Sequence, residues 1–181
     1  MKFVSFFTDN YTEEAHRLMD SLSRLNLQFE IEIIKNQGSW QANTQYKAKF
    51  LLKKQEKHGK VCWLDADCEV KKYPELLFDI NEDVAFHRFK DQELLSGTVF
   101  FNDSDAANLL LREWVKVNQE RPDKWDQKNL DEAIKRSPFV TIKQLPPEYC
   151  FIFDLSRKYY KITQPIIEHY QASREKKCES S

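Results

Sequence analysis

The chain has 181 residues, of which 41% are hydrophobic and 13% aromatic, so it can form one domain with a sizeable buried core. Its 28 basic and 29 acidic side chains leave a formal net charge of −1, which excludes a bulk attraction to nucleic acid or anionic lipid. No apolar run approaches the roughly 20 residues of a membrane span, and the N-terminal MKFVSFF is too short for a signal-peptide core. We therefore expect a cytoplasmic protein without a membrane span.

The first 70 residues alternate between strand-like and helix-like patterns. The predicted elements are, in chain order, a strand at 2–7, a helix from Asn10 with a capping box to Glu13, a strand at 29–34, a helix at 42–58 ending at Gly59, and a strand in KVCWLD at 60–65. Strands separated by helices of this length imply crossover connections. The sequence thus predicts parallel strands with helices packed against the sheet.

The second half has a different pattern. It contains a short helix after Pro74, strands at 83–89 and 97–102, helices at 103–120 and 125–136, and three short apolar segments at 139–145, 149–153 and 165–170. We expect the last three to be irregular or antiparallel additions. The prediction is one compact α/β domain, with a nucleotide-binding-like half at about 1–70, a mixed half at about 71–174, and a tail or linker at 175–181.

An acidic pair follows the most apolar of the predicted strands. In VCWLDADCEV, residues 61–70, Asp65 stands at the carboxyl end of the strand, where α/β sheets bind ligands. If the backbone stays extended through Ala66, Asp65 and Asp67 point the same way. Two adjacent carboxylates repel unless they share a proton or a cation, and a divalent metal with oxygen ligands satisfies both.

A second Asp-x-Asp triplet, at Asp103 and Asp105, serves as an internal comparison. It precedes AANLLLREW, a helical pattern whose inward face we expect to include Leu109 and Trp114. Acidic residues at a helix start complement the helix dipole, so this triplet is interpreted as structural. The four cysteines lack metal-ligand spacing and are interpreted as free thiols in a reducing compartment.

The motif VCWLDADCEV resembles the strand and DxD motif of glycosyltransferases with the GT-A fold. Five further segments follow the order seen in glycosyltransferase family 8 and its relatives: QYKAKFLL (45–52), LLSGTVFFN (94–102), DQKNLDEAI (126–134), LPPEYCFIF (145–153) and IIEHYQA (166–172). The resemblance covers nearly the whole chain. It implies a Rossmann-like mixed sheet flanked by helices, a nucleotide-sugar donor that is usually UDP-linked, and Mn²⁺ between protein carboxylates and the diphosphate.

The resemblance also implies a ligand set for the metal. The second Asp of the motif maps onto Asp67 and a late histidine onto His169, while Asp65 would contact the metal or the ribose. An imidazole ligand favours Mn²⁺, although Mg²⁺ stays an alternative. A metal at this place stabilises the charge that grows on the departing diphosphate. Outside the resemblance, a lone histidine in an apolar strand is more often a hydrogen-bonded core residue.

Contacts to the nucleotide follow from the same resemblance. The loop after the first strand, with Thr8, Asn10 and Tyr11, would hold the nucleoside, although Tyr11 fits a helix-entry contact equally well. Lys49 corresponds to a basic position that touches the nucleotide in relatives, but it also suits a solvated helix face. Arg174 is the candidate for the diphosphate, in a segment where relatives commonly carry glycine and lysine.

The donor sugar and the acceptor hydroxyl are assigned to two other segments. Gly97 lets the backbone approach a ligand, and Ser96 can bond a donor hydroxyl. Asp126 and Gln127 open a helix, where a carboxylate is also a normal cap. By analogy they face the donor sugar and the acceptor. Asp126 would act as general base if the enzyme inverts the anomeric centre, and the pair would stabilise an oxocarbenium-like centre if it retains.

The sequence is interpreted as a metal-dependent glycosyltransferase that uses a glycan, protein or small-molecule hydroxyl as acceptor, with a length compatible with one unit of a longer polypeptide. A haloacid-dehalogenase-like phosphotransferase is one alternative, but that pattern expects Thr or Val where Glu69 stands. A non-catalytic sugar-binding module is another. Trp40 and Trp125, if exposed, suit either a lectin surface or an acceptor platform.

Overall fold

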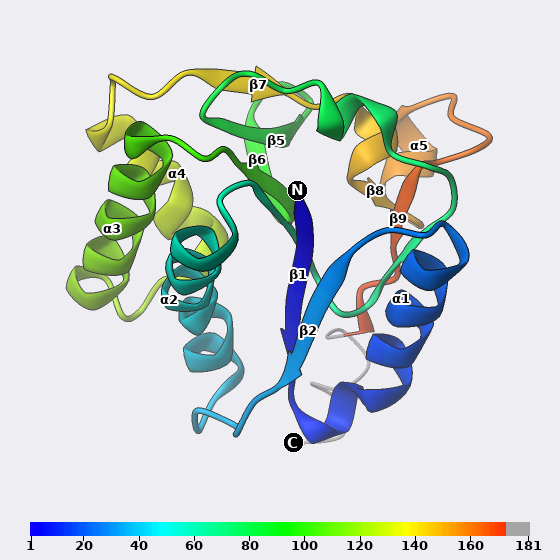
Figure 1. The fold of residues 1–181 in the computed structure, drawn as a ribbon, viewed down its shortest axis with the longest axis horizontal. Helices are drawn as coiled ribbons and strands as arrows, with labels where there is room; N and C mark the ends of the chain where they lie inside the picture. Colours follow the sequence, from blue (N-terminus) through cyan, green and yellow to red (C-terminus); the bar gives the residue numbers. More distant parts are fainter. Residues whose placement is uncertain (173–181) are drawn as a thin grey trace.

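The computed structural model describes residues 1–172, and a six-stranded sheet runs through its centre (Figure 1). The strand order is β2-β1-β3-β6-β5-β7. The strands are β1 Lys2–Phe7, β2 Phe29–Ile33, β3 Val61–Leu64, β5 Val84–Phe89, β6 Glu93–Phe101 and β7 Ile142–Gln144. β1 is parallel to β2 and β3, whereas β6 is antiparallel to both β3 and β5. The predicted β-α-β-α-β arrangement of the first half is confirmed.

Helices cover both faces of this sheet. The helices are α1 Thr12–Arg24, α2 Trp40–His58, α3 Asp105–Glu120, α4 Asp126–Arg136 and the short α5 Ser156–Tyr159, with 3-10 turns at Asp9–Tyr11, Glu75–Phe78 and Pro147–Tyr149. In Figure 1, α2, α3 and α4 lie on one side of the sheet and α1 on the other. Trp63, Phe101 and Trp114 belong to the core under α2–α4, and Phe3 and Leu18 to the core under α1.

Local chemistry fixes the ends of the longer helices. The Ser39 hydroxyl accepts from the Ala42 amide at 3.0 Å at the start of α2, and Gly59 ends the helix at φ +70°, a conformation that favours glycine. Ser104 caps α3 by accepting from the Ala107 amide at 3.1 Å. The second Asp-x-Asp triplet therefore does mark a helix start, with its central serine as the cap.

Two details of the predicted helices are wrong. The helix predicted from Asn10 begins at Thr12 after a 3-10 turn, and the Asn10 side chain accepts from the Thr8 hydroxyl at 2.6 Å instead of forming a capping box. In α3, Leu109 is 53% exposed, while Leu111 is buried. Three consecutive leucines span more than one helix face, so their pattern left the inward direction ambiguous.

A second, three-stranded sheet with the order β4-β9-β8 carries the end of the described chain. Its strands are β4 Cys68–Val70, β8 Phe151–Ile152 and β9 Ile167–His169. β9 is antiparallel to β4, but β8 is parallel to β9 and β7 is parallel to β5. The late segments are thus antiparallel only in part: β7 and β9 pair with strands distant in sequence, and β8 pairs in parallel with the next strand, β9.

The backbone between the two sheets turns instead of staying extended. Ala66 and Asp67 form a turn in which the Cys68 amide donates to the Asp65 carbonyl at 3.1 Å. The prediction of an extended backbone through Ala66 is therefore wrong. The physical reason is that β3 and β4 belong to different sheets, so the chain must change direction between them.

The structure shows buried free thiols at Cys62, Cys68 and Cys150, and Cys178 lies outside the described residues.

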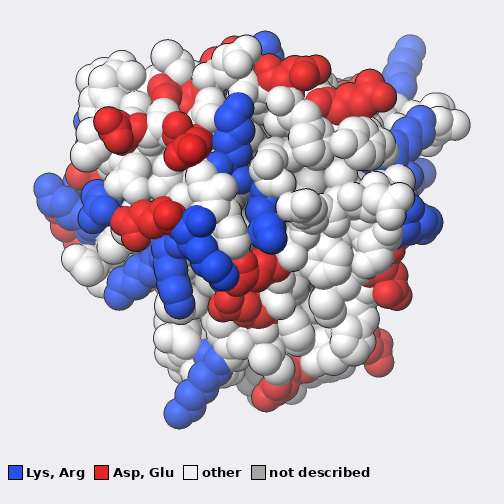
Figure 2. All heavy atoms as spheres, viewed as in Figure 1, with Lys and Arg blue, Asp and Glu red and all other residues white. Residues whose placement is uncertain are grey.

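Charged side chains of both signs mix on the face shown in Figure 2. At the β2 edge of the large sheet, Glu30 accepts from Lys54 at 2.6 Å and from Lys57 at 3.0 Å. Charged edge strands resist pairing with other chains.

Within residues 1–172, every helix is too short or too polar to cross a membrane.

Side chains of helix α1 hold β4 in place by hydrogen bonds to its backbone. The Ser21 hydroxyl accepts from the buried Val70 amide at 3.1 Å, and the Arg24 guanidinium donates to the Val70 carbonyl at 3.2 Å. Since β4 follows directly after Asp67, these contacts fix the start of the small sheet relative to the large one.

We predict that Ser21→Ala lowers the free energy of unfolding by about 1–3 kcal/mol, because it leaves the buried Val70 amide without its acceptor. Ser23→Ala, on the exposed side of the same helix, is the matched control and shares the gain in helix propensity. Urea denaturation of both variants measures the difference. Equal stability of the two variants would contradict the role of Ser21.

Candidate active site

A cavity of about 310 Å³ opens at the carboxyl ends of β1 and β3. β3 ends at Leu64, which pairs with Thr98 of the antiparallel β6, so Asp65 faces Gly97 and its amide donates to the Gly97 carbonyl at 2.9 Å. The starts of α2 and α4 also contribute side chains to its wall. The cavity therefore lies at the sheet edge where α/β folds bind ligands.

Three potential metal ligands meet in this cavity. Asp65, Asp67 and His169 each offer one ligand atom, and these atoms lie within 4.8 Å of one another. Asp65 follows β3, Asp67 lies in the turn before β4, and His169 ends β9, where it pairs with Cys68. The turn at Ala66 thus brings the two carboxylates together, which was expected of an extended backbone, and the pairing of β9 with β4 brings His169 to them.

One oxygen of Asp65 is fully engaged by neighbouring donors. Its Oδ1 accepts from the Lys47 ammonium at 2.9 Å and from the Trp63 indole at 2.7 Å. Burial raises the pKa of Asp65, but the charge of Lys47 and these hydrogen bonds lower it below its usual range overall. Asp65 is therefore ionised at neutral pH, with Oδ2 left to face the cluster.

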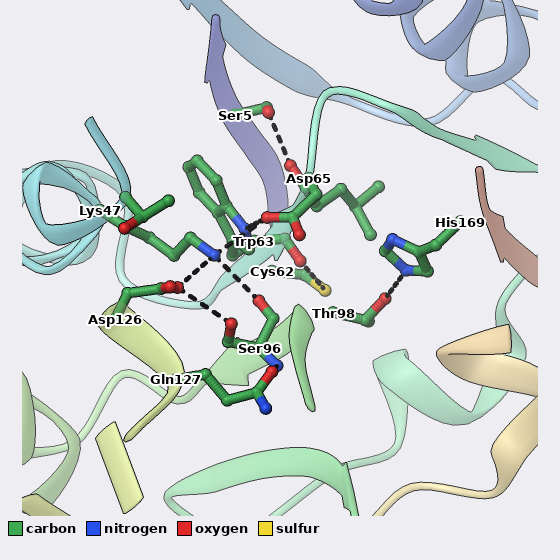
Figure 3. Close-up of polar contacts among 12 residues, drawn as sticks. Ser5, Lys47, Cys62, Trp63, Asp65, Ser96, Thr98, Asp126, Gln127 and His169 are labelled. Atoms are coloured by element: carbon green, nitrogen blue, oxygen red, sulfur yellow. Dashed lines mark hydrogen bonds and ion pairs between the residues drawn. The ribbon is translucent and has the colours of Figure 1, made fainter. Parts of the chain in front are cut away.

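Lys47 connects Asp65 with Asp126 (Figure 3). Its Nζ lies 2.7 Å from Asp126 Oδ2 and donates to the Ser96 carbonyl at 3.2 Å, and its side chain is 5% exposed. Burial lowers the pKa of Lys47, but the charges of Asp126 and Asp65 raise it above its usual value overall. The Ser96 hydroxyl donates to Asp126 at 2.9 Å, so Asp126, like Asp65, accepts a second hydrogen bond besides its contact with Lys47.

Asp67 is held by the backbone that follows β9. Its Oδ2 accepts from the Ala172 amide at 2.8 Å, and its carbonyl accepts from the Tyr170 amide at 3.2 Å. Burial and the charge of Asp65 raise the pKa of Asp67 to about 6. Three carboxyl groups, those of Asp65, Asp67 and Asp126, thus lie around the single ammonium group of Lys47, and this excess of acidic groups suits a divalent cation.

His169 is present as a neutral imidazole. Burial lowers its pKa to about 4, and neutral imidazole is the form that binds metals. Its Nε2 is hydrogen-bonded to the Thr98 hydroxyl at 2.9 Å, which orients the ring and leaves Nδ1 on the side of Asp65 (Figure 3).

Gly97 keeps the space between Asp65 and His169 open. A Cβ atom at position 97 would lie 2.9 Å from His169 Nδ1 and 3.3 Å from Asp65 Oδ2. A cradle that a single methyl group would fill, lined by carboxylate oxygen and imidazole nitrogen, fits a divalent cation that accepts mixed oxygen and nitrogen ligands. The residues present therefore fit the metal that the sequence resemblance implies.

The other predicted site residues divide into three groups. The cavity lining includes Thr8, Tyr11, Ser96, Asp126 and Gln127. Asn10 and Lys49 are exposed and lie outside this lining. Arg174 lies outside the described residues. Lys47, on the same helix as Lys49, lines the cavity. Helical spacing could have indicated this, since Lys47 shares a face with the buried Phe50 and Leu51. No feature of the sequence identified Thr98 and Trp63 as the hydrogen-bonding partners of His169 and Asp65.

The fold can be compared with solved structures. A glycosyltransferase involved in the glycosylation of the major capsid of PBCV-1 superposes with a TM-score of 0.75 and 16% identity, over 99% of this chain and 98% of that chain. The chain has the fold of a glycosyltransferase. The GT-A-like architecture predicted from the sequence is confirmed.

Two further glycosyltransferase structures support the same architecture. GlyE of Streptococcus pneumoniae TIGR4 gives a TM-score of 0.68 at 16% identity, over 93% of this chain and 54% of that chain. The galactosyltransferase LgtC, in complex with donor and acceptor sugar analogs, gives 0.62 at 12% identity, over 94% of this chain and 87% of that chain. No protein-family model and no curated protein sequence matches the chain. At these identities the likeness establishes the fold.

We predict that Lys47→Met lowers the free energy of unfolding by about 3–5 kcal/mol, because it leaves the buried Asp126 carboxylate and one oxygen of Asp65 without their cation. Lys49→Met, two residues along α2 with an exposed side chain, should change stability by less than about 0.5 kcal/mol. Chemical denaturation at neutral pH compares the two. A Lys47→Met variant as stable as Lys49→Met would refute the importance of the buried pair.

Proposed function

We propose that the chain is a metal-dependent glycosyltransferase that transfers a sugar from a nucleotide-sugar donor, UDP-linked by preference, to a hydroxyl acceptor. The observation that carries this proposal is the convergence of Asp65, Asp67 and His169 in one cavity of the glycosyltransferase fold. The descriptions of the solved neighbours name glycosyl transfer, and that of LgtC names a donor and an acceptor sugar analog.

Asp65, Asp67 and His169 would hold the cation, and the imidazole ligand favours Mn²⁺ over Mg²⁺. When bound, the metal supplies Lewis-acid stabilisation for the charge that develops on the departing diphosphate. The chain's own residues prepare the site: Lys47 and Trp63 fix one oxygen of Asp65, and Thr98 orients His169. The ligands are therefore preorganised, which lowers the cost of binding.

The remaining cavity residues suit the rest of a nucleotide sugar. Thr8 and Tyr11, beyond the end of β1, lie on the side where we place the nucleoside. Ser96 and Gln127 lie toward α4, where we place the donor sugar. Oδ2 of Asp126 is bound to Lys47 and Ser96 and the residue is buried, so its carboxylate is poorly placed to take a proton from the acceptor. We assign Asp126 to positioning Lys47 in preference to general-base catalysis.

The two alternatives are less well supported. A phosphotransferase would need Asp65 as a nucleophile, but one of its oxygens already accepts two hydrogen bonds and the other faces His169 and Gly97. A non-catalytic sugar-binding module would give the metal ligands in the cavity no departing diphosphate to stabilise. Release of sugar from UDP-sugars that depends on a divalent metal separates the transferase from such a module.

We predict that UDP raises the melting temperature in the presence of Mn²⁺ by more than either does alone, because both bind at the cluster in the folded state. Asp67→Asn should weaken Mn²⁺ binding about tenfold or more, because it removes one charged ligand. Asp105→Asn, in the second Asp-x-Asp triplet, is the matched control and should leave the shift unchanged. Calorimetric titration supplies the affinities.

An equal response of the Asp67→Asn and Asp105→Asn variants would remove Asp67 from the ligand set. If UDP and Mn²⁺ fail to stabilise the unmodified protein, and no nucleotide sugar does so in their place, the proposed function is wrong.

We predict that Gly97→Ala weakens Mn²⁺ binding about tenfold while the fold is kept, because the added methyl group occupies the space between His169 and Asp65. Gly38→Ala, in an exposed loop at φ +99°, is the control: its methyl group would meet no atom within 4 Å, and the backbone strain it adds there is remote from the metal ligands. The electron paramagnetic resonance signal of free Mn²⁺ measures binding, and circular dichroism checks the fold. Unchanged affinity in Gly97→Ala would place the cation elsewhere.

A further inference from the structure

Two exposed tryptophans stand at the wall of the cavity. Trp40 begins α2 and is 38% exposed, and Trp125 immediately precedes α4 and is 42% exposed. The other two tryptophans of the chain, Trp63 and Trp114, are buried in the core. Large aromatic side chains that stay exposed beside a cavity commonly mark a binding surface.

The loop that carries Trp125 is held firmly against α2. The Gln41 side-chain amide donates to the Pro122 carbonyl at 2.7 Å, and that of Gln45 donates to the Lys124 carbonyl at 2.5 Å. Each tryptophan thus neighbours a residue of this network. The two rings are carried by backbone segments that hydrogen bonds lock together, although α2 and the α3–α4 loop are about 80 residues apart in sequence.

Further hydrogen bonds fix the backbone of both segments. The Asn129 side chain of α4 donates to the Arg121 carbonyl at 3.2 Å, and the Asn43 side chain accepts from the Gln37 amide at 2.7 Å in the loop before Trp40. The backbone that carries the two rings is therefore fixed before any ligand arrives. A preorganised aromatic surface binds with little loss of conformational entropy.

Polar groups lie beside the rings. Thr44 and Gln127 line the same cavity, and the Lys47–Asp126 pair lies there as well. A pyranose ring presents a face of C–H groups that packs against an aromatic ring, and an edge of hydroxyl groups that needs hydrogen-bonding partners. The combination of indole faces with hydroxyl and amide groups matches both parts of a sugar.

We propose that Trp40 and Trp125 form the stacking site for the pyranose ring of a sugar acceptor. This inference rests on the proposed glycosyl transfer and makes it more specific, since it selects a glycan or glycoside over a protein side chain or an acyclic alcohol. The uracil of the donor is the competing occupant. The tryptophans come from α2 and the α4 start, next to Asp126 and Gln127, whereas Thr8 and Tyr11 come from the segment between β1 and α1.

The test uses the four indole N–H signals of the ¹⁵N-tryptophan-labelled protein, in the presence of Mg²⁺ and UDP. The probes are methyl glycosides of glucose, galactose, mannose, xylose and N-acetylglucosamine, with glycerol and a blocked serine amide as hydroxyl compounds without a ring. We expect at least one glycoside to shift the Trp40 and Trp125 signals in a saturable way, while the signal of the buried Trp114 stays fixed.

Substitutions then assign the contact. Trp40→Ala and Trp125→Ala should each raise the dissociation constant of that glycoside about tenfold, Trp→Phe at either position should restore most of the affinity, and UDP binding should change less than about twofold. Phe139→Ala is the matched control, because Phe139 is an exposed aromatic residue outside the cavity lining. It should leave glycoside binding unchanged.

Three outcomes would overturn the inference: no glycoside shifts the two signals although UDP and metal bind, the ring-free hydroxyl compounds shift them equally, or the alanine variants lose UDP instead of the glycoside. In each case metal and UDP binding by the unmodified protein persists, so the proposed function would stand. Failure of the unmodified protein to bind metal with any nucleotide sugar would instead refute the proposed function itself.

Discussion

The site depends on the contacts of the buried Lys47 ammonium group with Asp65 and Asp126. A charge removed from water needs opposite charges and hydrogen-bond acceptors around it. Asp65 from the end of β3, Asp126 from the start of α4 and the Ser96 carbonyl from β6 meet this need. One lysine therefore ties together α2, α4 and the middle of the large sheet, and the same contacts aim Asp65 at the cluster with His169.

The boundary between the two sheets supplies the rest of the geometry. The turn at Ala66 takes the chain out of the large sheet, so Asp67 belongs to the small sheet's side of the cavity. β9 then returns from the far end of the described chain to pair with β4 and delivers His169. The candidate ligands thus come from both sheets, and Gly97 leaves the gap between them clear of side-chain atoms.

The sequence predicted best what local periodicity determines. The strands around Phe3, Ile31 and Trp63 and the helix ending at Gly59 follow from patterns within about 20 residues. Patterns of this range could not reveal the turn at Ala66, which exists only because β4 pairs with a strand about 100 residues away. Helical spacing places Lys47 on the buried face of α2, but only the three-dimensional structure shows that Asp65 and Asp126 surround its ammonium group.

The pairing of β4 with β9 also bears on the order in which the protein folds. Contacts between Cys68 and His169 close a loop of about 100 residues, and such long-range pairings form slowly because the chain must lose much entropy first. The large sheet, whose first three strands lie within 64 residues, has shorter loops to close. Affinity for a cation at this cluster would therefore arise only in the last stage of folding, and metal uptake would then report on the docking of β9.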